Sequence, residues 1–119
     1  MKLALKIDAA TFRGTLVGVP RLVDVLRSAE AQASFFFNLG PDRSGRMLAG
    51  LLHGTLLPGP DVGRRCADIL RGVRDAGFDT GVQCWDHAAW QGGVEKAGAA
   101  WAERQMQRAI ARYGKIFGE

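Results

Sequence analysis

Three short apolar segments, separated by stretches with helical periodicity, restrict this chain to an α/β fold. The apolar segments cover residues 3–7, 33–37 and 81–85, and each has the length of an ordinary strand. The stretches between them carry apolar residues three and four positions apart, which is the spacing of one helix face. The resulting order β-α-β-α-α-β-α predicts parallel strands joined by helical crossovers.

Each predicted strand ends next to polar residues. The first, Leu3–Ile7, is followed by Asp8, and the third, Gly81–Trp85, is followed by Asp86 and His87. The second, Ala33–Phe37, carries apolar residues on both of its faces, so we expect both faces to be covered. Asn38 and Asp42 come after it.

The helices are predicted from rows of apolar residues at helical spacing and from the residues that typically begin or end a helix. One helix begins near Gly18 with Pro20 in its first turn, and a second begins after an Asp61 cap and ends at Gly77. A weaker helix is expected over about residues 44–52, a loop over 90–93 and a long helix over about 95–117. The predicted core stripes of the three stronger helices are Val19, Leu22, Val23 and Leu26; Val62, Cys66, Ile69, Leu70 and Val73; and Ala102, Met106, Ala109, Ile110, Tyr113 and Phe117.

Size and composition indicate one domain over residues 1–119, without a membrane span or signal peptide, and therefore a cytoplasmic protein. Cys66 and Cys84 are too few for a disulfide framework and are expected to be buried free thiols. The net charge of +4 admits an anionic partner. No nucleic-acid-binding motif accompanies that charge, so nucleic acid is not an expected partner.

The basic residues of the last helix, Arg104, Arg108, Arg112 and Lys115, share one side. The interpretation that we favour is a solvated face. Contact with a phosphate or with an anionic membrane surface at the inner face of the membrane is the alternative.

Because the carboxyl ends of parallel strands meet at one edge of the sheet, the polar residues that follow the three strands are expected to converge there. Amide deacylation with a bound metal requires a metal-activated water, a carboxylate base and an acid for the leaving amine. A histidine pair spaced His-x-x-x-His with one carboxylate is a common ligand set for such a metal.

Two segments carry a family resemblance: Lys6-Ile7-Asp8-Ala9-Ala10-Thr11-Phe12-Arg13-Gly14 and Gln83-Cys84-Trp85-Asp86-His87. They resemble the first two motifs of the polysaccharide-deacetylase superfamily (NodB-like, carbohydrate esterase family 4). The similarity is greatest to the branch that removes a formyl group from formamido-arabinose on undecaprenyl phosphate. Further segments that resemble the family's sequences, in the same order along the chain, lie at residues 18–22, 35–37, 40–42 and 90–91.

The resemblance implies a partial, amino-terminal half of a distorted β/α barrel, since the complete family domain is about twice this length. It also implies that Asp8 is the catalytic base and His87 a metal ligand, with zinc or a similar divalent cation as cofactor. Ala10 and Gln83 take the family's other two ligand positions, where Asp and His are usual, so we expect them not to bind and the chain to hold no metal.

For the substrate, a lipid-linked amino sugar, the expected contacts are Arg13, Trp85 and Trp90. The alternative roles of these three residues are structural. Arg13 would close its loop, and the two tryptophans would pack in the core or at the rim. His53 matches no later family motif and is expected to be a surface residue.

Three functional hypotheses remain open on the sequence. The chain is an inactive relative of a carbohydrate deformylase, or it completes an active site by association with itself or another chain through open sheet edges. The third hypothesis is a non-catalytic module that binds a lipid-linked sugar phosphate.

Overall fold

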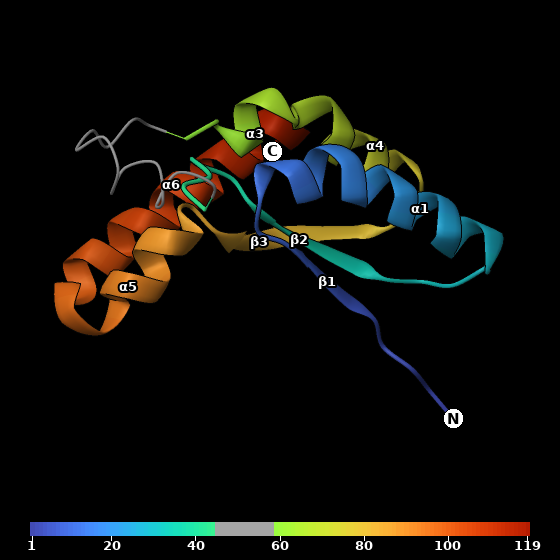
Figure 1. The fold of residues 1–119 in the computed structure, drawn as a ribbon, viewed down its shortest axis with the longest axis horizontal. Helices are drawn as coiled ribbons and strands as arrows, with labels where there is room; N and C mark the ends of the chain where they lie inside the picture. Colours follow the sequence, from blue (N-terminus) through green and yellow to red (C-terminus); the bar gives the residue numbers. More distant parts are fainter. Residues whose placement is uncertain (45–58) are drawn as a thin grey trace.

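A three-stranded parallel sheet with helices over one face forms the centre of the molecule in the computed structural model, which describes residues 1–44 and 59–119 (Figure 1). The strands are β1 (Lys6–Ala9), β2 (Ser34–Asn38) and β3 (Asp79–Cys84), in the order β1-β2-β3. Helices connect them, as the element order of the sequence predicts, and both strand pairs are parallel. The α/β prediction with helical crossovers is therefore confirmed.

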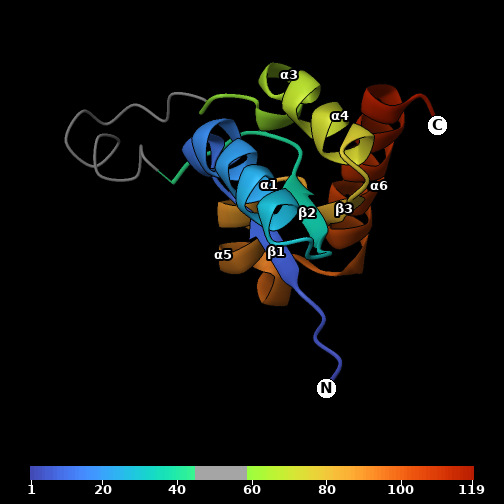
Figure 2. The ribbon, with the colours of Figure 1, turned by 90° about the vertical axis from the view of Figure 1, so that its right-hand side faces the viewer.

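The helices are a short π-helix η1 (Gly14–Gly18), α1 (Val19–Ser28), α3 (Val62–Arg65), α4 (Ala67–Asp75), α5 (His87–Ala97) and α6 (Ala99–Phe117). Figure 1 shows α1, α3, α4 and α6 on one side of the sheet, with α5 beyond the ends of the strands. The view in Figure 2 separates α1 and α6 to either side of α4. None of these helices combines the length and the hydropathy that crossing a bilayer requires.

The core lies between the helices and one face of the sheet. Phe35 and Phe37 of β2 are completely buried there, and Phe35 also meets Phe78 edge-on, with ring centroids 5.6 Å apart. The other residues that bury most of their surface in this core are Ala9, Val19, Leu26, Ala33, Leu39, Val62, Cys66, Leu70, Val73 and Ile116.

The opposite face of the sheet, which we call the open face, has no helix over it in the described part of the chain. It carries Lys6 and Asp8 of β1, Phe36 of β2 and Gly81 of β3; a side chain at Gly81 would meet the Phe36 ring. Phe36 is only partly buried. The prediction that β2 is covered on both faces was therefore wrong, because hydrophobic residues on both sides of a strand do not supply a second layer to cover it.

The first strand was predicted too early. Residues 3–5 precede β1, and Leu3 and Leu5 are 75% and 37% exposed. Pairing with β2 decides the boundary: Ser34, its first residue, pairs with Lys6. The second and third strands are likewise shifted by one or two residues from their predicted ranges.

The predicted helix after Asp61 is divided into α3 and α4 at Cys66, whose backbone (φ −105°, ψ 13°) is not helical. The Asp61 cap is confirmed, since its side chain accepts a hydrogen bond from the Arg64 amide at 2.9 Å. Gly77 follows α4 with φ of 93°, a conformation that favours glycine.

Residues 90–93, predicted as a loop, belong to α5. Their two glycines weaken helix propensity, but Asp86 caps the helix and Trp90 stacks on Trp101 of α6 with centroids 5.9 Å apart. A break at Gly98 (φ 81°) separates α5 from α6, so the predicted single helix over 95–117 was wrong at its start.

Three predicted core residues are exposed: Leu22 by 41%, Met106 by 43% and Ile110 by 59%. Each lies on an amphipathic helix but points away from the layer that the helix covers. The predictions for the helix at 44–52 and for His53 fall on residues 45–58, outside the described part of the chain. Cys66 and Cys84 are both buried and free, as predicted.

The two faces of β2 should differ sharply in their contribution to stability. We expect Phe35→Ala to lower the free energy of unfolding by about 3–5 kcal/mol, the usual cost of removing a buried phenylalanine ring. Phe36→Ala, on the open face of the same strand, is the matched control and should cost clearly less. Urea denaturation of both variants measures the difference; equal losses would contradict the assignment of the core to one face of the sheet.

Candidate functional site

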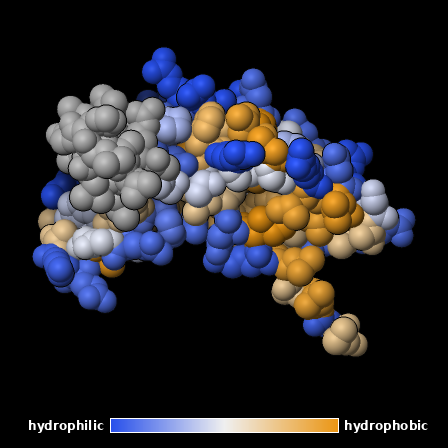
Figure 3. Space-filling view, in the orientation of Figure 1, coloured by the Kyte–Doolittle hydropathy of each residue, from blue (hydrophilic) through white to orange (hydrophobic). Residues whose placement is uncertain are grey.

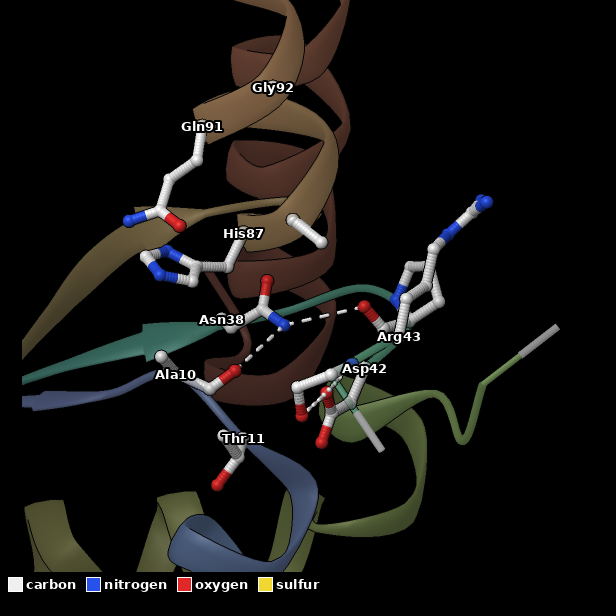
Figure 4. Close-up of a pocket in the computed structure, with 11 residues that line it drawn as sticks. Ala10, Thr11, Asn38, Asp42, Arg43, His87, Gln91 and Gly92 are labelled. Atoms are coloured by element: carbon white, nitrogen blue, oxygen red, sulfur yellow. Dashed lines mark hydrogen bonds between the residues drawn. The ribbon is translucent and has the colours of Figure 1, made fainter. Parts of the chain in front are cut away.

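The carboxyl ends of the three strands surround a cavity of about 460 Å³. Of the polar residues expected to converge at the strand ends, Asn38, Asp42 and His87 line this cavity (Figure 4). Asp86 and Asp8 do not line it, and Asp8 lies within β1 rather than after it. The other residues that line the cavity are Ala10, Thr11, Pro41, Arg43, Ser44, Ala88, Gln91 and Gly92.

Asn38 holds the strand ends together beneath this cavity. Its side chain is 1% exposed, and its Nδ2 donates to the carbonyl oxygens of Ala10 (3.3 Å) and Pro41 (3.5 Å). Its Oδ1 accepts a hydrogen bond from Cys84 Sγ at 3.4 Å. Burial, together with the carboxylates of Asp86 and Asp8, raises the pKa of the Cys84 thiol to about 11. The thiol therefore keeps its proton near neutral pH and remains a donor.

Asp42 is an organised carboxylate at the cavity wall. Its Oδ2 accepts from the amide of Phe12 at 2.6 Å, and its Oδ1 accepts from the amide and the hydroxyl of Ser44 at 2.8 and 2.6 Å. Partial burial acts to raise the pKa of Asp42, but these hydrogen bonds and the nearby His87 outweigh it and hold the pKa below its ordinary value.

His87 and Gln91 occupy one face of α5 because residues four apart in a helix are neighbours. In Figure 4 the imidazole of His87 lies over Asn38 and Ala10, and the carboxamide of Gln91 points toward it. Asp86 caps the start of α5, where its Oδ1 accepts a hydrogen bond from the Ala89 amide at 3.0 Å. Its Oδ2 forms an ion pair with Arg43 Nε at 2.9 Å. Asp86 is 4% exposed, so this ion pair joins the loop after β2 to the helix that carries His87.

The residues at the family's metal positions do not fit a metal site. Ala10 lines the cavity but has no side-chain ligand atom, and Asp8 forms a 2.9 Å ion pair with Lys6 and is not among the lining residues. In residues 1–44 and 59–119, no group of three His, Cys, Asp or Glu side chains is placed to hold a metal ion.

Gln83, at the position of the other expected ligand, lies at an irregularity of the sheet. Phe37 pairs with Val82 and Asn38 with Cys84, so Gln83 is the extra residue of a bulge in β3. Its Oε1 is buried and has no hydrogen-bond partner among the residues that the structure describes. The sequence contained no signal for this bulge.

The three predicted substrate contacts lie outside the cavity lining. Arg13 is exposed next to η1. The Trp85 ring packs beneath the guanidinium of Arg112, 5.1 Å from its carbon, and against Gly40, where a side chain would collide with the ring. Trp90 stacks on Trp101. For the tryptophans, these contacts correspond to the packing alternative considered for the sequence.

Arg43 and Gln91 are lining residues that the sequence did not single out as site residues. The spacing of Gln91 four residues after His87 could have indicated Gln91 if residues 90–93 had been predicted as helix. The Arg43–Asp86 ion pair joins residues far apart in the sequence, and no local pattern predicts it.

The hydrogen bonds of Asp42 should contribute to stability in a pH-dependent way. Because folding lowers its pKa from the ordinary 3.8, the ionised carboxylate stabilises the fold above that pH, and this contribution is lost as pH falls through the lower folded pKa. Asp42→Asn should reduce the free energy of unfolding by roughly 1–3 kcal/mol at pH 7.

The measurement is urea denaturation of both proteins between pH 7 and pH 2, with Asp24→Asn on the exposed side of α1 as control. The difference between the unaltered chain and Asp42→Asn should narrow below pH 4. A difference that stays constant over this range would contradict the hydrogen-bonded carboxylate.

The similarity to characterised protein families rests on individual relatives, since no protein-family model matches the chain. A probable 4-deoxy-4-formamido-L-arabinose-phosphoundecaprenol deformylase ArnD of Shewanella sediminis is 37% identical, over 76% of this chain and 37% of that protein. A protein of the same name from Wigglesworthia glossinidia brevipalpis is 27% identical, over 66% of this chain and 35% of its own length.

The chain thus spans little more than a third of the length of the curated relatives that it matches. Its parallel sheet and helical crossovers are compatible with part of a polysaccharide-deacetylase-type barrel. On these grounds the chain is a relative of the polysaccharide-deacetylase-like ArnD deformylases and corresponds to their amino-terminal part.

Proposed function

We propose that the cavity at the strand ends binds the sugar of a lipid-linked amino sugar, and that this chain by itself does not hydrolyse the amide. The names of the relatives identify a formamido-arabinose carried on phosphoundecaprenol as the substrate class. The observation that carries the proposal is the cavity itself: polar groups line it, while Ala10 occupies a position where a ligand carboxylate would be needed.

The cavity has the size of a monosaccharide site, and polar groups lie at a wall whose accessible surface is mostly apolar. Its volume of about 460 Å³ is within the range of small-molecule sites. Asp42 offers an ionised acceptor, and His87 and Gln91 offer a ring nitrogen and a carboxamide, so sugar hydroxyls and a formamido group find both donors and acceptors. Arg43 carries positive charge at the same wall, where its Nε is held by Asp86.

Hydrolysis requires more than these binding groups. Asp8, the expected base, is paired with Lys6 and does not line the cavity. The cation that the family would use to activate water has one candidate ligand, His87, among the three expected positions. We therefore derive no catalytic step for this chain, and we propose that residues 1–119 act as one sugar-binding domain.

Zinc content and turnover separate binding from catalysis. After zinc loading and dialysis, we expect the unaltered chain to retain no stoichiometric zinc and to release no formate from the lipid-linked formamido sugar. The double variant Ala10→Asp/Gln83→His tests whether the fold can present the family's ligand set: zinc retained by this variant alone would show that the identities of residues 10 and 83, and not the bulge at residue 83, prevent metal binding. Zinc retained stoichiometrically by the unaltered chain, with turnover abolished in Asp8→Asn, would overturn the proposal of a non-catalytic site.

Sugar binding can be tested without turnover. Titration of the isotope-labelled chain with water-soluble 4-formamido-arabinose phosphate, followed by NMR, should shift the amides of α5 and of residues 38–44. Gln91→Ala should weaken this binding by roughly 3- to 10-fold, the loss of one hydrogen bond. Gln32→Ala, an exposed glutamine far from the cavity, is the control. Unchanged affinity in Gln91→Ala, or no shift in the unaltered chain, would contradict the proposed site.

A further inference from the structure

The geometry points to a dimer: we propose that two copies of this chain pair through the free edge of β1, antiparallel, with Lys6 of each copy opposite Asp8 of the other. The strand order β1-β2-β3 leaves β1 at one edge of the sheet described by residues 1–44 and 59–119. Such an edge presents amide and carbonyl groups that a further strand can pair with.

The backbone of β1 determines which residues pair at this edge. The Ser34 amide donates to the Leu5 carbonyl at 3.0 Å, so the backbone groups of Leu5 face β2. Successive residues of a strand direct these groups to opposite sides. The amides and carbonyls of Lys6 and Asp8 therefore face outward, away from β2, and are the ones that a second copy would meet.

Charge selects one register among those that the backbone allows. In an antiparallel pair, residues with outward backbone groups must lie opposite each other. One register places Lys6 opposite Lys6, and another places Asp8 opposite Asp8. Both put like charges directly across the pair, which is unfavourable. In the register centred on Ile7, each Lys6 lies opposite an Asp8, which gives two unlike pairs around the two-fold axis.

A lysine on an edge strand normally discourages pairing. Here the aspartate two residues later lies on the same face as Lys6, and the two side chains are already 2.9 Å apart in one copy. A second copy in the register centred on Ile7 presents the complementary order of charges, which an arbitrary strand does not. Pairing of this edge with a second copy is therefore less unfavourable than pairing with an arbitrary strand.

Exposed apolar surface beside this edge adds to the proposal. Met1 and Leu3 are largely exposed before β1, and Leu5 is 37% exposed. Figure 3 shows this apolar surface continuing from the amino-terminal arm onto the neighbouring part of the molecule. In the register centred on Ile7, Leu5 lies opposite Ala9 of the second copy, so pairing would cover part of this surface.

Charge reversal gives a test with an internal control. Sedimentation equilibrium of the unaltered chain over a hundredfold range of concentration should show a monomer–dimer equilibrium. Lys6→Asp and Asp8→Lys, each alone, replace both unlike pairs by like pairs and should weaken dimerisation by roughly tenfold or more. An equimolar mixture of the two variants restores unlike pairs in the heterodimer, so dimerisation should return to nearly its original strength.

The double variant Lys6→Asp/Asp8→Lys keeps every pair unlike and should dimerise as the unaltered chain does. Asp79→Lys, a charge reversal on β3 at the other edge, is the matched control and should leave the dimer unchanged. Circular dichroism checks that every variant is folded. A monomer at all concentrations, single variants that dimerise normally, or a mixture that stays monomeric would each overturn the proposal.

Discussion

The buried carboxamide of Asn38 is the interaction on which the cavity depends. It reaches the carbonyl of Ala10 after β1, the carbonyl of Pro41 in its own loop and the thiol of Cys84 at the end of β3. One side chain thus joins the carboxyl ends of all three strands. A buried polar group is costly unless it is hydrogen-bonded, and this one uses both its donor and its acceptor groups.

Two carboxylates organise the wall of the cavity around Asn38. Asp42 is held by amides from two segments, and Asp86 fixes both the start of α5 and the side chain of Arg43. These groups position the residues that line the cavity. Within residues 1–44 and 59–119, no three His, Cys, Asp or Glu side chains are grouped so that they could hold a metal ion. This arrangement of side chains is the basis of the proposed recognition of a polar ligand.

Much of the fold could be predicted from local patterns. The number and order of strands, their parallel pairing, the Asp61 cap and the buried thiols follow from apolar runs, breakers and capping residues. The errors share one physical origin, since they concern which partner an element meets. Leu3 and Leu5 lie before the strand because β2 begins opposite Lys6, and the glycine-containing segment at 90–93 is helical because Asp86 caps α5 and Trp90 stacks on Trp101.

The sequence by itself determined that polar residues gather near the carboxyl end of each strand, and it already showed that Ala10 contributes no ligand atom. Tertiary structure decided which of those residues share a cavity. Asp42 and His87 line it, whereas Asp8 turns to Lys6 and Gln83 is displaced into a bulge. Strand ends are local features of a chain, but register, bulges and long-range ion pairs arise only when segments distant in sequence pack together.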